Sequence, residues 1–205
     1  MAAEQGPRLI LASASPARQQ VLRQAGLHPD VVVSQVDESG FTAPDVISLV
    51  AVLAEAKATD VLAQVPDEDV LVVGCDSLLE FAGEPFGKPA DLDQAKQRWL
   101  RMRGASGQLH TGHHVWYRHD GRIERASSVA TTEVIFANLD EAEIDAYLAT
   151  GEPLKVAGGF TIDGLGGAYV TTLCGDPHNV VGISLPLLRR LLSELGVPWH
   201  SLWRS

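Results

Sequence analysis

The stretch Val70–Ala90 reads VLVVGCDSLLEFAGEPFGKPA. Its first four residues are a continuous apolar run, which predicts a strand buried on both faces of a parallel or mixed sheet. The sequence predicts that this strand ends at Gly74-Cys75-Asp76, and ligands in open α/β sheets bind just past the carboxyl ends of such strands. Gly87-Lys88-Pro89 closes the next turn. The carboxylate of Asp76 and the amine of Lys88 would then lie at the same edge of the sheet. This arrangement predicts a binding site for a metal ion and a polyanion.

Composition narrows the class of protein. The chain has 205 residues, 45% of them hydrophobic, which is enough for one large domain or two small lobes with a packed core. The formal net charge of -10 argues against a broad surface for nucleic acid or an anionic membrane, since both require a basic patch. No apolar run approaches the roughly 18 residues of a spanning helix, and the N-terminus lacks signal-peptide features, so we expect a soluble, cytoplasmic protein.

The two cysteines, Cys75 and Cys174, are far apart in the sequence. They provide neither a disulfide framework nor metal-ligand spacing, and we interpret each as a small buried hydrophobe. His110, His113 and His114 invite a zinc interpretation. However, His113 and His114 would face opposite sides of a strand, and no further ligand completes a set at the usual spacing.

The first loop carries a helix-start signal. Arg8–Ala12 predicts a short strand, and in Ser13-Ala14-Ser15-Pro16 the second serine suits an N-cap and the proline the first helical position. In the helix predicted at Pro16–Gly26, Arg18 heads the apolar stripe. Two hydroxyls, the free N–H groups and Arg18 together predict a phosphate cradle. The alternative is an arginine whose stem covers apolar surface while its head stays in water.

Charged residues also occupy unusual places in the next two elements. Val31–Ser34 predicts a second strand that runs into a polar turn containing Asp37 and Glu38. A long helix is predicted at Asp45–Ala63, and Lys57 falls in the middle of its apolar stripe. Because desolvating an ammonium group is costly, an inward Lys57 implies a carboxylate or a bound phosphate nearby. The alternative is a lysine that snorkels to solvent.

The rest of the chain contains further helices and strands and a glycine-rich loop. The predicted helices are Asp91–Arg103, Asp140–Thr150 and Ser184–Gly196, and the predicted strands are Gln108–Tyr117, Ile123–Phe136 and Ala168–Leu173. Asp120-Gly121 suits a hairpin between the first two of these strands, and Gly175–Asn179 predicts a turn. Five glycines between Ala157 and Gly167 suit close backbone approach but lack the context of a dinucleotide fingerprint.

Three separated stretches together resemble the Maf family of nucleoside triphosphate pyrophosphatases. They are Leu9–Pro16 with Arg18, Gly74–Ser77 with Gly87-Lys88-Pro89, and Gly175-Asp176 with Asn179–Gly182. Further segments fit in register between them, namely Val36-Asp37-Glu38, Ala56-Lys57-Ala58, Thr111-Gly112 and Gly151–Leu154. The resemblance covers the chain from Arg8 to about Gly196.

The resemblance implies a single Maf-like domain over residues 1–205. Its α/β fold would have an elongated mixed central sheet flanked by helices, with two lobes around a cleft, as in inosine triphosphate pyrophosphatases. The implied activity is hydrolysis of the α–β phosphoanhydride of a nucleoside triphosphate, with Mg²⁺ or Mn²⁺ as cofactor, in a house-cleaning role in nucleotide metabolism. By matching position, Asp76 would be the general base or a metal ligand beside Glu38. The implied phosphate-binding shell is Ser13, Arg18, Lys57 and Lys88.

These residue types suit that reaction. Cations must offset charge on the triphosphate and, more strongly, on the departing pyrophosphate. Carboxylate oxygens are suitable ligands for Mg²⁺ or Mn²⁺, which can lower the pKa of an attacking water. Cys75 is better interpreted as part of the wall than as a nucleophile.

The chain departs from the family pattern at several positions. Ala17 stands where the family often has an arginine, and Ser77 stands where one branch has threonine. Asp163 replaces an amide at a position that matches base recognition, and an ionised aspartate accepts hydrogen bonds but cannot donate them. The preferred base, a canonical pyrimidine or a modified one, is therefore left open. So is whether Lys155 replaces a cation that relatives carry next to it, at Val156.

Two other functions are weighed against the enzyme. One is a non-catalytic nucleotide-binding regulator of cell division, because the family name is tied to septum formation. Tight triphosphate binding without turnover would favour it. The other is a nucleic-acid-binding module, which the acidic balance disfavours. The expected partner is thus a nucleoside triphosphate, with no nucleic acid and no membrane, and a homodimer is one candidate for the assembly.

Overall fold

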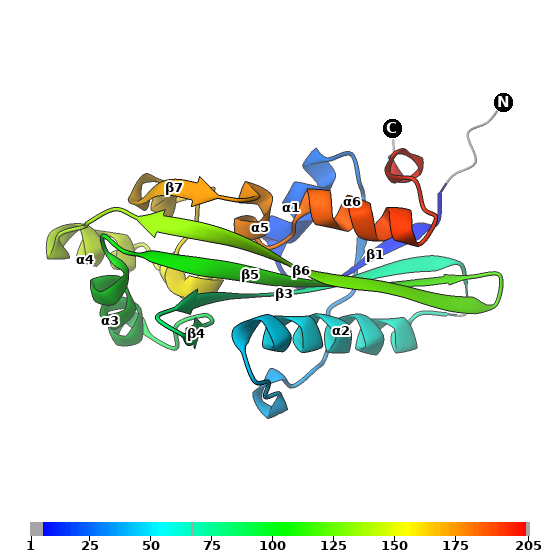
Figure 1. The fold of residues 1–205 in the computed structure, drawn as a ribbon, viewed down its shortest axis with the longest axis horizontal. Helices are drawn as coiled ribbons and strands as arrows, with labels where there is room; N and C mark the ends of the chain where they lie inside the picture. Colours follow the sequence, from blue (N-terminus) through cyan, green and yellow to red (C-terminus); the bar gives the residue numbers. More distant parts are fainter. Residues whose placement is uncertain (1–5, 67, 204–205) are drawn as a thin grey trace. The chain divides into compact units, whose positions relative to one another are not determined.

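The computed structural model describes residues 6–66 and 68–203 (Figure 1). Its strands are β1 Arg8–Ala12, β2 Asp30–Val31, β3 Val70–Phe81, β4 Glu84–Phe86, β5 Ser106–His119, β6 Arg122–Phe136 and β7 Val170–Cys174. Its α-helices are α1 Pro16–Gln24, α2 Val46–Gln64, α3 Leu92–Met102, α4 Glu141–Ala149, α5 Pro177–Val181 and α6 Leu185–Glu194. Among these residues, no helix has the length and apolar character needed to cross a membrane.

The strands form one mixed sheet. Their order is β2-β1-β3-β5-β6-β7, and β4 also pairs with β3, which makes seven strands. β1 runs parallel to β2 and β3, whereas β4 is antiparallel to β3 and β7 is antiparallel to β6. The predicted α/β class, with a mixed central sheet flanked by helices, is therefore confirmed.

The described residues divide into two compact units, each with its own core. The first unit holds residues 6–76, 111–130 and 182–203, apart from residue 67, and the second holds residues 77–110 and 131–181. Buried residues on β1, α2 and β3 form one core cluster of the first unit, namely Ile10, Ala12, Ala58, Val61, Val70 and Val72. The core of the second unit is built around Trp99 of α3, whose ring packs edge-on against Phe136, Tyr147 and Tyr169.

Two glycines let α2 lie with its backbone directly on the sheet of the first unit. A Cβ atom at Gly74 would come within 2.3 Å of the Ala54 carbonyl oxygen, and one at Gly112 within 2.1 Å of the Val50 carbonyl oxygen. Real Cβ atoms essentially never approach so closely, so this packing requires glycine at both positions. α2 covers one face of this part of the sheet, and α1 and α6 lie over the other (Figure 1).

β3 is longer than the apolar run that predicts it. The predicted end at Gly74-Cys75-Asp76 is wrong, because the strand continues to Phe81. β1 ends at Ala12, opposite Gly74, and further along β3 pairs with β4 instead. A second neighbour therefore extends the strand after the first has ended, and Asp76 lies inside β3.

Two other predicted elements also differ. β2 contains only Asp30–Val31 rather than Val31–Ser34. The Val32 N–H still donates to the Leu11 carbonyl oxygen of β1 at 3.2 Å, and by Gln35 the chain has turned to α2, where the Asp60 side chain accepts the Gln35 N–H at 2.8 Å. The prediction of a turn at Gly175–Asn179 is wrong from Pro177 on, because residues 177–179 already belong to the short helix α5. The Asp176 carboxylate accepts the N–H of His178, 3.0 Å away, in the first turn of that helix.

The helices predicted from capping signals are confirmed close to their ends. Asp45, Asp91, Asp140 and Ser184 are the N-cap residues of α2, α3, α4 and α6, and each side chain accepts a backbone N–H of the first turn. The predicted hairpin is also confirmed. Asp120 and Gly121 have φ angles of 48° and 72°, as a two-residue turn between twisted strands requires.

Candidate active site

The candidate site lies at the carboxyl end of β1. β1 ends at Ala12, opposite Gly74, so its pairing with β3 stops two residues before Asp76. The chain leaves β1 through Ser13–Ser15 and enters α1, while β3 continues to Asp76. The end of a parallel strand beside a continuing one is a place where α/β sheets bind ligands.

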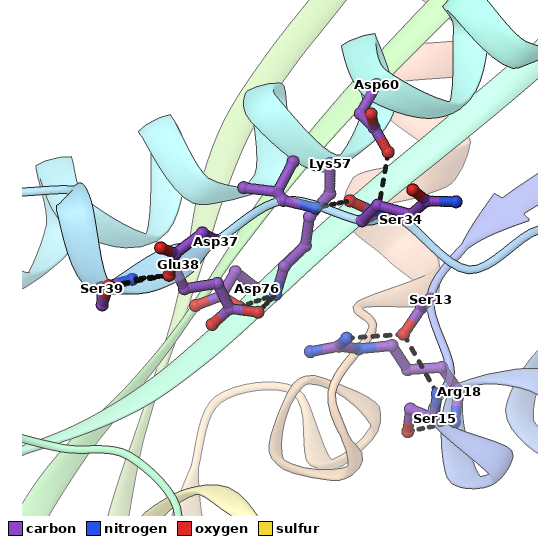
Figure 2. Close-up of polar contacts among 12 residues, drawn as sticks. Ser13, Ser15, Arg18, Ser34, Asp37, Glu38, Ser39, Lys57, Asp60 and Asp76 are labelled. Atoms are coloured by element: carbon purple, nitrogen blue, oxygen red, sulfur yellow. Dashed lines mark hydrogen bonds and ion pairs between the residues drawn. The ribbon is translucent and has the colours of Figure 1, made fainter.

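Asp76, Lys57 and Glu38 form one ionic cluster (Figure 2). The ammonium group of Lys57 contacts Asp76 Oδ1 and lies 2.8 Å from Glu38 Oε1. Only 8% of the Asp76 side chain and 13% of the Lys57 side chain are exposed, whereas Glu38 is 53% exposed. The prediction that an inward lysine has a carboxylate nearby is therefore confirmed. The close packing of α2 at Gly74 is what brings Lys57 to this strand.

The site raises the pKa of Asp76. Burial is the main cause, because it penalises the charged carboxylate, and the Glu38 charge adds to it. The neighbouring Lys57 and the Arg18 guanidinium both act in the opposite direction. Burial also raises the pKa of the adjacent Cys75 thiol to about 11, so this thiol is neutral at physiological pH. This is consistent with the interpretation of Cys75 as part of the wall.

The first loop holds the Arg18 guanidinium in place. Arg18 Nη1 donates to Ser13 Oγ at 2.9 Å, and Arg18 Nε donates to the Gly182 carbonyl oxygen at 2.7 Å. Ser15 caps α1 by accepting the Arg18 N–H, and Ser13 Oγ also accepts the Ser15 N–H (Figure 2). The guanidinium is thus fixed by protein oxygens, which fits the predicted cradle better than the alternative of a head directed into water.

Gly182 is required where the chain passes Arg18. Its φ angle is 118°, and a Cβ atom there would lie 3.0 Å from Arg18 Nε. Both the backbone conformation and the close approach favour glycine. The motif around Gly182 therefore helps to position Arg18, although the two residues are far apart in the sequence.

The loop that carries Glu38 is tied down by two aspartates. Asp60 of α2 accepts the Gln35 N–H at 2.8 Å. Asp37 turns back to its own loop, where its Oδ1 accepts the N–H and the hydroxyl of Ser39, and these hydrogen bonds lower the pKa of Asp37. Of the two adjacent carboxylates, Glu38 is therefore the one that reaches Lys57. Sequence reasoning missed Asp60, whose only signal is its position three residues after Lys57.

The other candidate residues belong to the second unit. Ser77 directly follows Asp76 on β3, and Lys88 and Asp163 lie in loops and are exposed. The turn that carries Lys88 is held by Arg98, whose Nη1 donates to the Gly87 carbonyl oxygen at 2.7 Å. The first unit thus holds the ionic cluster of Glu38, Lys57 and Asp76 together with the Ser13–Arg18 pair, whose guanidinium charge acts on Asp76. Ser77, Lys88 and Asp163 lie in the second unit.

The oxygen atoms of the cluster fit a divalent cation that also binds phosphate. The part of the chain that the structure describes has no group of three or more histidine, cysteine, aspartate or glutamate side chains suited to a metal. Mg²⁺, however, is usually held by only one or two carboxylates together with substrate phosphates. Glu38 and Asp76, which share one cationic partner, match this smaller donor set.

Comparison with known proteins agrees with this site. Residues 8–195 match the model of the family described as Maf-like protein. The chain belongs to the Maf family. A protein named nucleoside triphosphate pyrophosphatase from Salinispora tropica is 55% identical over 96% of this chain and 87% of its own length. Proteins of the same name from Cutibacterium acnes and Streptomyces coelicolor are 49% and 52% identical, each over 96% of this chain and 94% of their own lengths.

Among solved structures, the Staphylococcus aureus Ham1 protein matches 64% of this chain and 72% of its own, at 16% identity and a TM-score of 0.37. That likeness is too low to support an argument. The predicted membership of the Maf family is thus confirmed by the family model and by relatives that are about half identical over nearly the whole chain.

Proposed function

We propose that this Maf protein hydrolyses the α–β phosphoanhydride bond of a nucleoside triphosphate, giving a nucleoside monophosphate and pyrophosphate. The observation that carries the proposal is the buried Asp76, ion-paired with Lys57 beside Glu38. It is supported by relatives named nucleoside triphosphate pyrophosphatase, about half identical over nearly the whole chain.

Asp76 is proposed to act on the attacking water. The water oxygen bonds to the α-phosphorus, its proton passes to the Asp76 carboxylate, and the bond from the α-phosphorus to the bridging oxygen breaks. The pyrophosphate leaves with the electron pair of that bond. A base must be ionised to accept the proton, and Lys57 and Arg18 favour the ionised form of Asp76 despite its burial.

The cationic side chains are proposed to bind the phosphates. Arg18 is held in a fixed orientation by Ser13 and Gly182, so it loses little conformational freedom on binding. Lys57 and Lys88 would add charge that offsets the negative charge on the leaving pyrophosphate. The Ser13 hydroxyl would donate to a phosphate oxygen while it accepts from Arg18.

Glu38 and Asp76 are proposed to hold the divalent metal. When bound, Mg²⁺ or Mn²⁺ supplies charge neutralisation at the phosphates and a lower pKa for a bound water. Base selection is proposed to involve Asp163 and Ser77. The carboxylate of Asp163 favours a base that presents a hydrogen-bond donor, and the proposed substrates are pyrimidine or modified nucleoside triphosphates.

The test is a panel of purine, pyrimidine and modified triphosphates, each incubated with Mg²⁺ or Mn²⁺ and assayed separately for pyrophosphate and orthophosphate. Pyrophosphate release that requires metal supports the proposal, and release of orthophosphate alone contradicts it. Tight calorimetric binding of a triphosphate without turnover of any base would instead support the regulator of cell division.

A further inference from the structure

Glu152 lies outside the cluster described above, yet its carboxylate collects four hydrogen bonds. It follows α4 and stands directly before the short 3₁₀ turn Pro153–Lys155, to which its side chain makes no capping hydrogen bond. Its Oε1 accepts from the Tyr147 hydroxyl at 2.8 Å, the Thr161 hydroxyl at 2.5 Å and the Gly166 N–H at 2.9 Å, and its Oε2 accepts the Leu165 N–H at 3.1 Å. Three donors thus converge on Oε1 and one on Oε2, so both oxygens of the carboxylate accept hydrogen bonds.

Three of these donors belong to one short segment. Thr161 lies at its beginning, and Leu165 and Gly166 lie at its end. The residues between the two attachment points are Ile162-Asp163-Gly164, and Asp163 is exposed to solvent. A single side chain therefore fastens both ends of the segment that presents Asp163.

The backbone is shaped to receive this carboxylate. A Cβ atom at Gly164 would lie 2.7 Å from Glu152 Oε2, and one at Gly166 would lie 2.2 Å from the Tyr147 hydroxyl oxygen. Neither position has room for a larger residue while Glu152 and Tyr147 stay in place. The glycines thus let the segment wrap closely around the acid.

The carboxylate is ionised at physiological pH. Burial works against its charge, but the hydrogen bonds from Thr161, Gly166, Leu165 and Tyr147 outweigh burial and lower the pKa of Glu152 to about 2. Because four neighbouring groups all donate to this carboxylate, it must be deprotonated to accept their hydrogen bonds.

The same stretch of chain also contacts the turn that carries Lys88. The Gly158 N–H donates to the Gly87 carbonyl oxygen at 3.2 Å, and a Cβ atom at Gly159 would meet the Pro89 ring at 3.2 Å. The stretch of chain between Glu152 and Asp163 therefore contacts the turn that carries Lys88, one of the proposed phosphate ligands. Within the second unit, Gly158 and Gly159 thus connect the turn of Lys88 to the stretch that leads into the segment clamped by Glu152.

We propose that Glu152 is a positioning residue for nucleobase selection: by clamping Thr161 to Gly166 it fixes Asp163, and the discrimination between bases depends on that clamp. The inference rests on the proposed function. It assigns no contact between Glu152 and the substrate.

The test compares Glu152→Gln with Asp163→Asn and with the double variant. Glutamine keeps the size of the side chain but replaces one acceptor oxygen with a donor amide, which leaves at least one of the four donors unpaired. Glu143→Gln is the matched control, because Glu143 also accepts a backbone N–H in this unit, from Asp140 at 3.0 Å, but lies at the start of α4. Values of kcat and KM are measured for each triphosphate of the panel, at a temperature where every variant is folded.

In Glu152→Gln, the ratio of kcat/KM between the preferred and the poorest base should fall about tenfold, the effect of losing one well-placed hydrogen bond. The loss should lie mainly in KM for the preferred base, and Glu143→Gln should keep the wild-type ratio. If Glu152 acts through Asp163, adding Glu152→Gln to Asp163→Asn should change the ratio no further.

A Glu152→Gln variant that lowers kcat/KM by the same factor for every base would overturn the inference and leave only a structural clamp. Independent, additive effects of the two substitutions on the ratio would overturn it as well, as would a wild-type protein that does not discriminate between bases. Failure of the wild-type protein to release pyrophosphate from any triphosphate is a different result, because it refutes the proposed function itself.

Discussion

Replacing Lys57 with methionine should destabilise the protein, and more at high pH than at low pH. Methionine fills most of the same volume but leaves Asp76 buried without its ammonium partner. Removing one member of a buried ion pair typically costs about 3–5 kcal/mol of the free energy of unfolding. Here the cost is limited, because Asp76 can take up a proton instead of remaining charged.

The sign of the pH dependence follows from Asp76. Its pKa in the folded protein is already raised by burial, and Lys57 is the strongest influence that lowers it. Without Lys57 that pKa rises further. A carboxyl group with a raised folded pKa contributes stability at low pH that is lost as pH rises through that pKa. In the pH interval between the pKa of Asp76 in the folded wild type and its higher pKa in the folded variant, the loss of unfolding free energy caused by Lys57→Met should grow by about 1.4 kcal/mol per pH unit.

The assay is urea unfolding of the wild type and Lys57→Met at several values between about pH 5 and about pH 8. We expect a penalty of about 3 kcal/mol at the high end and a much smaller one at the low end. Lys96→Met is the control, because Lys96 pairs with Asp145 at the surface, and it should change little at any pH. A penalty for Lys57→Met that is independent of pH would refute this account of the cluster.

Three further predictions concern other parts of the structure. Asp60→Ala removes the side chain that anchors Gln35 in the loop carrying Glu38, a proposed metal ligand. The Mn²⁺ concentration needed for half-maximal turnover should rise several-fold, while the free energy of unfolding falls by only about 1 kcal/mol. An unchanged metal titration would count against a positioning role for Asp60. Gly74→Ala should cost about 1–3 kcal/mol or more in urea unfolding, because its Cβ would strike the Ala54 carbonyl, whereas Gly40→Ala, in open space, should be tolerated. The pKa of Glu152 in the folded protein is lowered from an ordinary value of 4.5 to about 2, so its contribution to stability should be lost as pH falls through this interval. Over the same interval, Glu152→Gln should lose less stability than the wild type. Equal acid sensitivity of the two proteins would contradict the hydrogen-bond network.

Features that depend on neighbouring residues could be predicted from the sequence. The starts of α2, α3 and α4 follow from Asp45, Asp91 and Asp140, because an N-cap acts on its own first turn. The hairpin at Asp120-Gly121 follows from the turn chemistry of that pair. Features that depend on distant partners could not be predicted. The extension of β3 needs β4 as a new neighbour. The path of the chain after β2 involves Asp60, which is 25 residues away from Gln35.

The candidate site shows the same division. Lys57 and Arg18 could be identified because a charge in an apolar stripe is unusual in any sequence. Nothing in the sequence decides whether Asp37 or Glu38 reaches Lys57, since that depends on which of them caps its own turn. Asp60 and Glu152 were missed because their partners include backbone N–H groups that follow no side-chain pattern. The roles of the site residues, the predicted cleft and the homodimer stay predictions.

In the proposed reaction, water attacks the α-phosphorus with the help of Asp76. The most direct measurement is hydrolysis of the preferred triphosphate in ¹⁸O-labelled water, with mass analysis of both products, for the wild type and for Asp76→Asn. If water attacks the α-phosphorus with the help of Asp76, the label enters the nucleoside monophosphate and not the pyrophosphate, and the folded Asp76→Asn variant loses nearly all turnover. Label in the pyrophosphate, or full activity of Asp76→Asn, would contradict it.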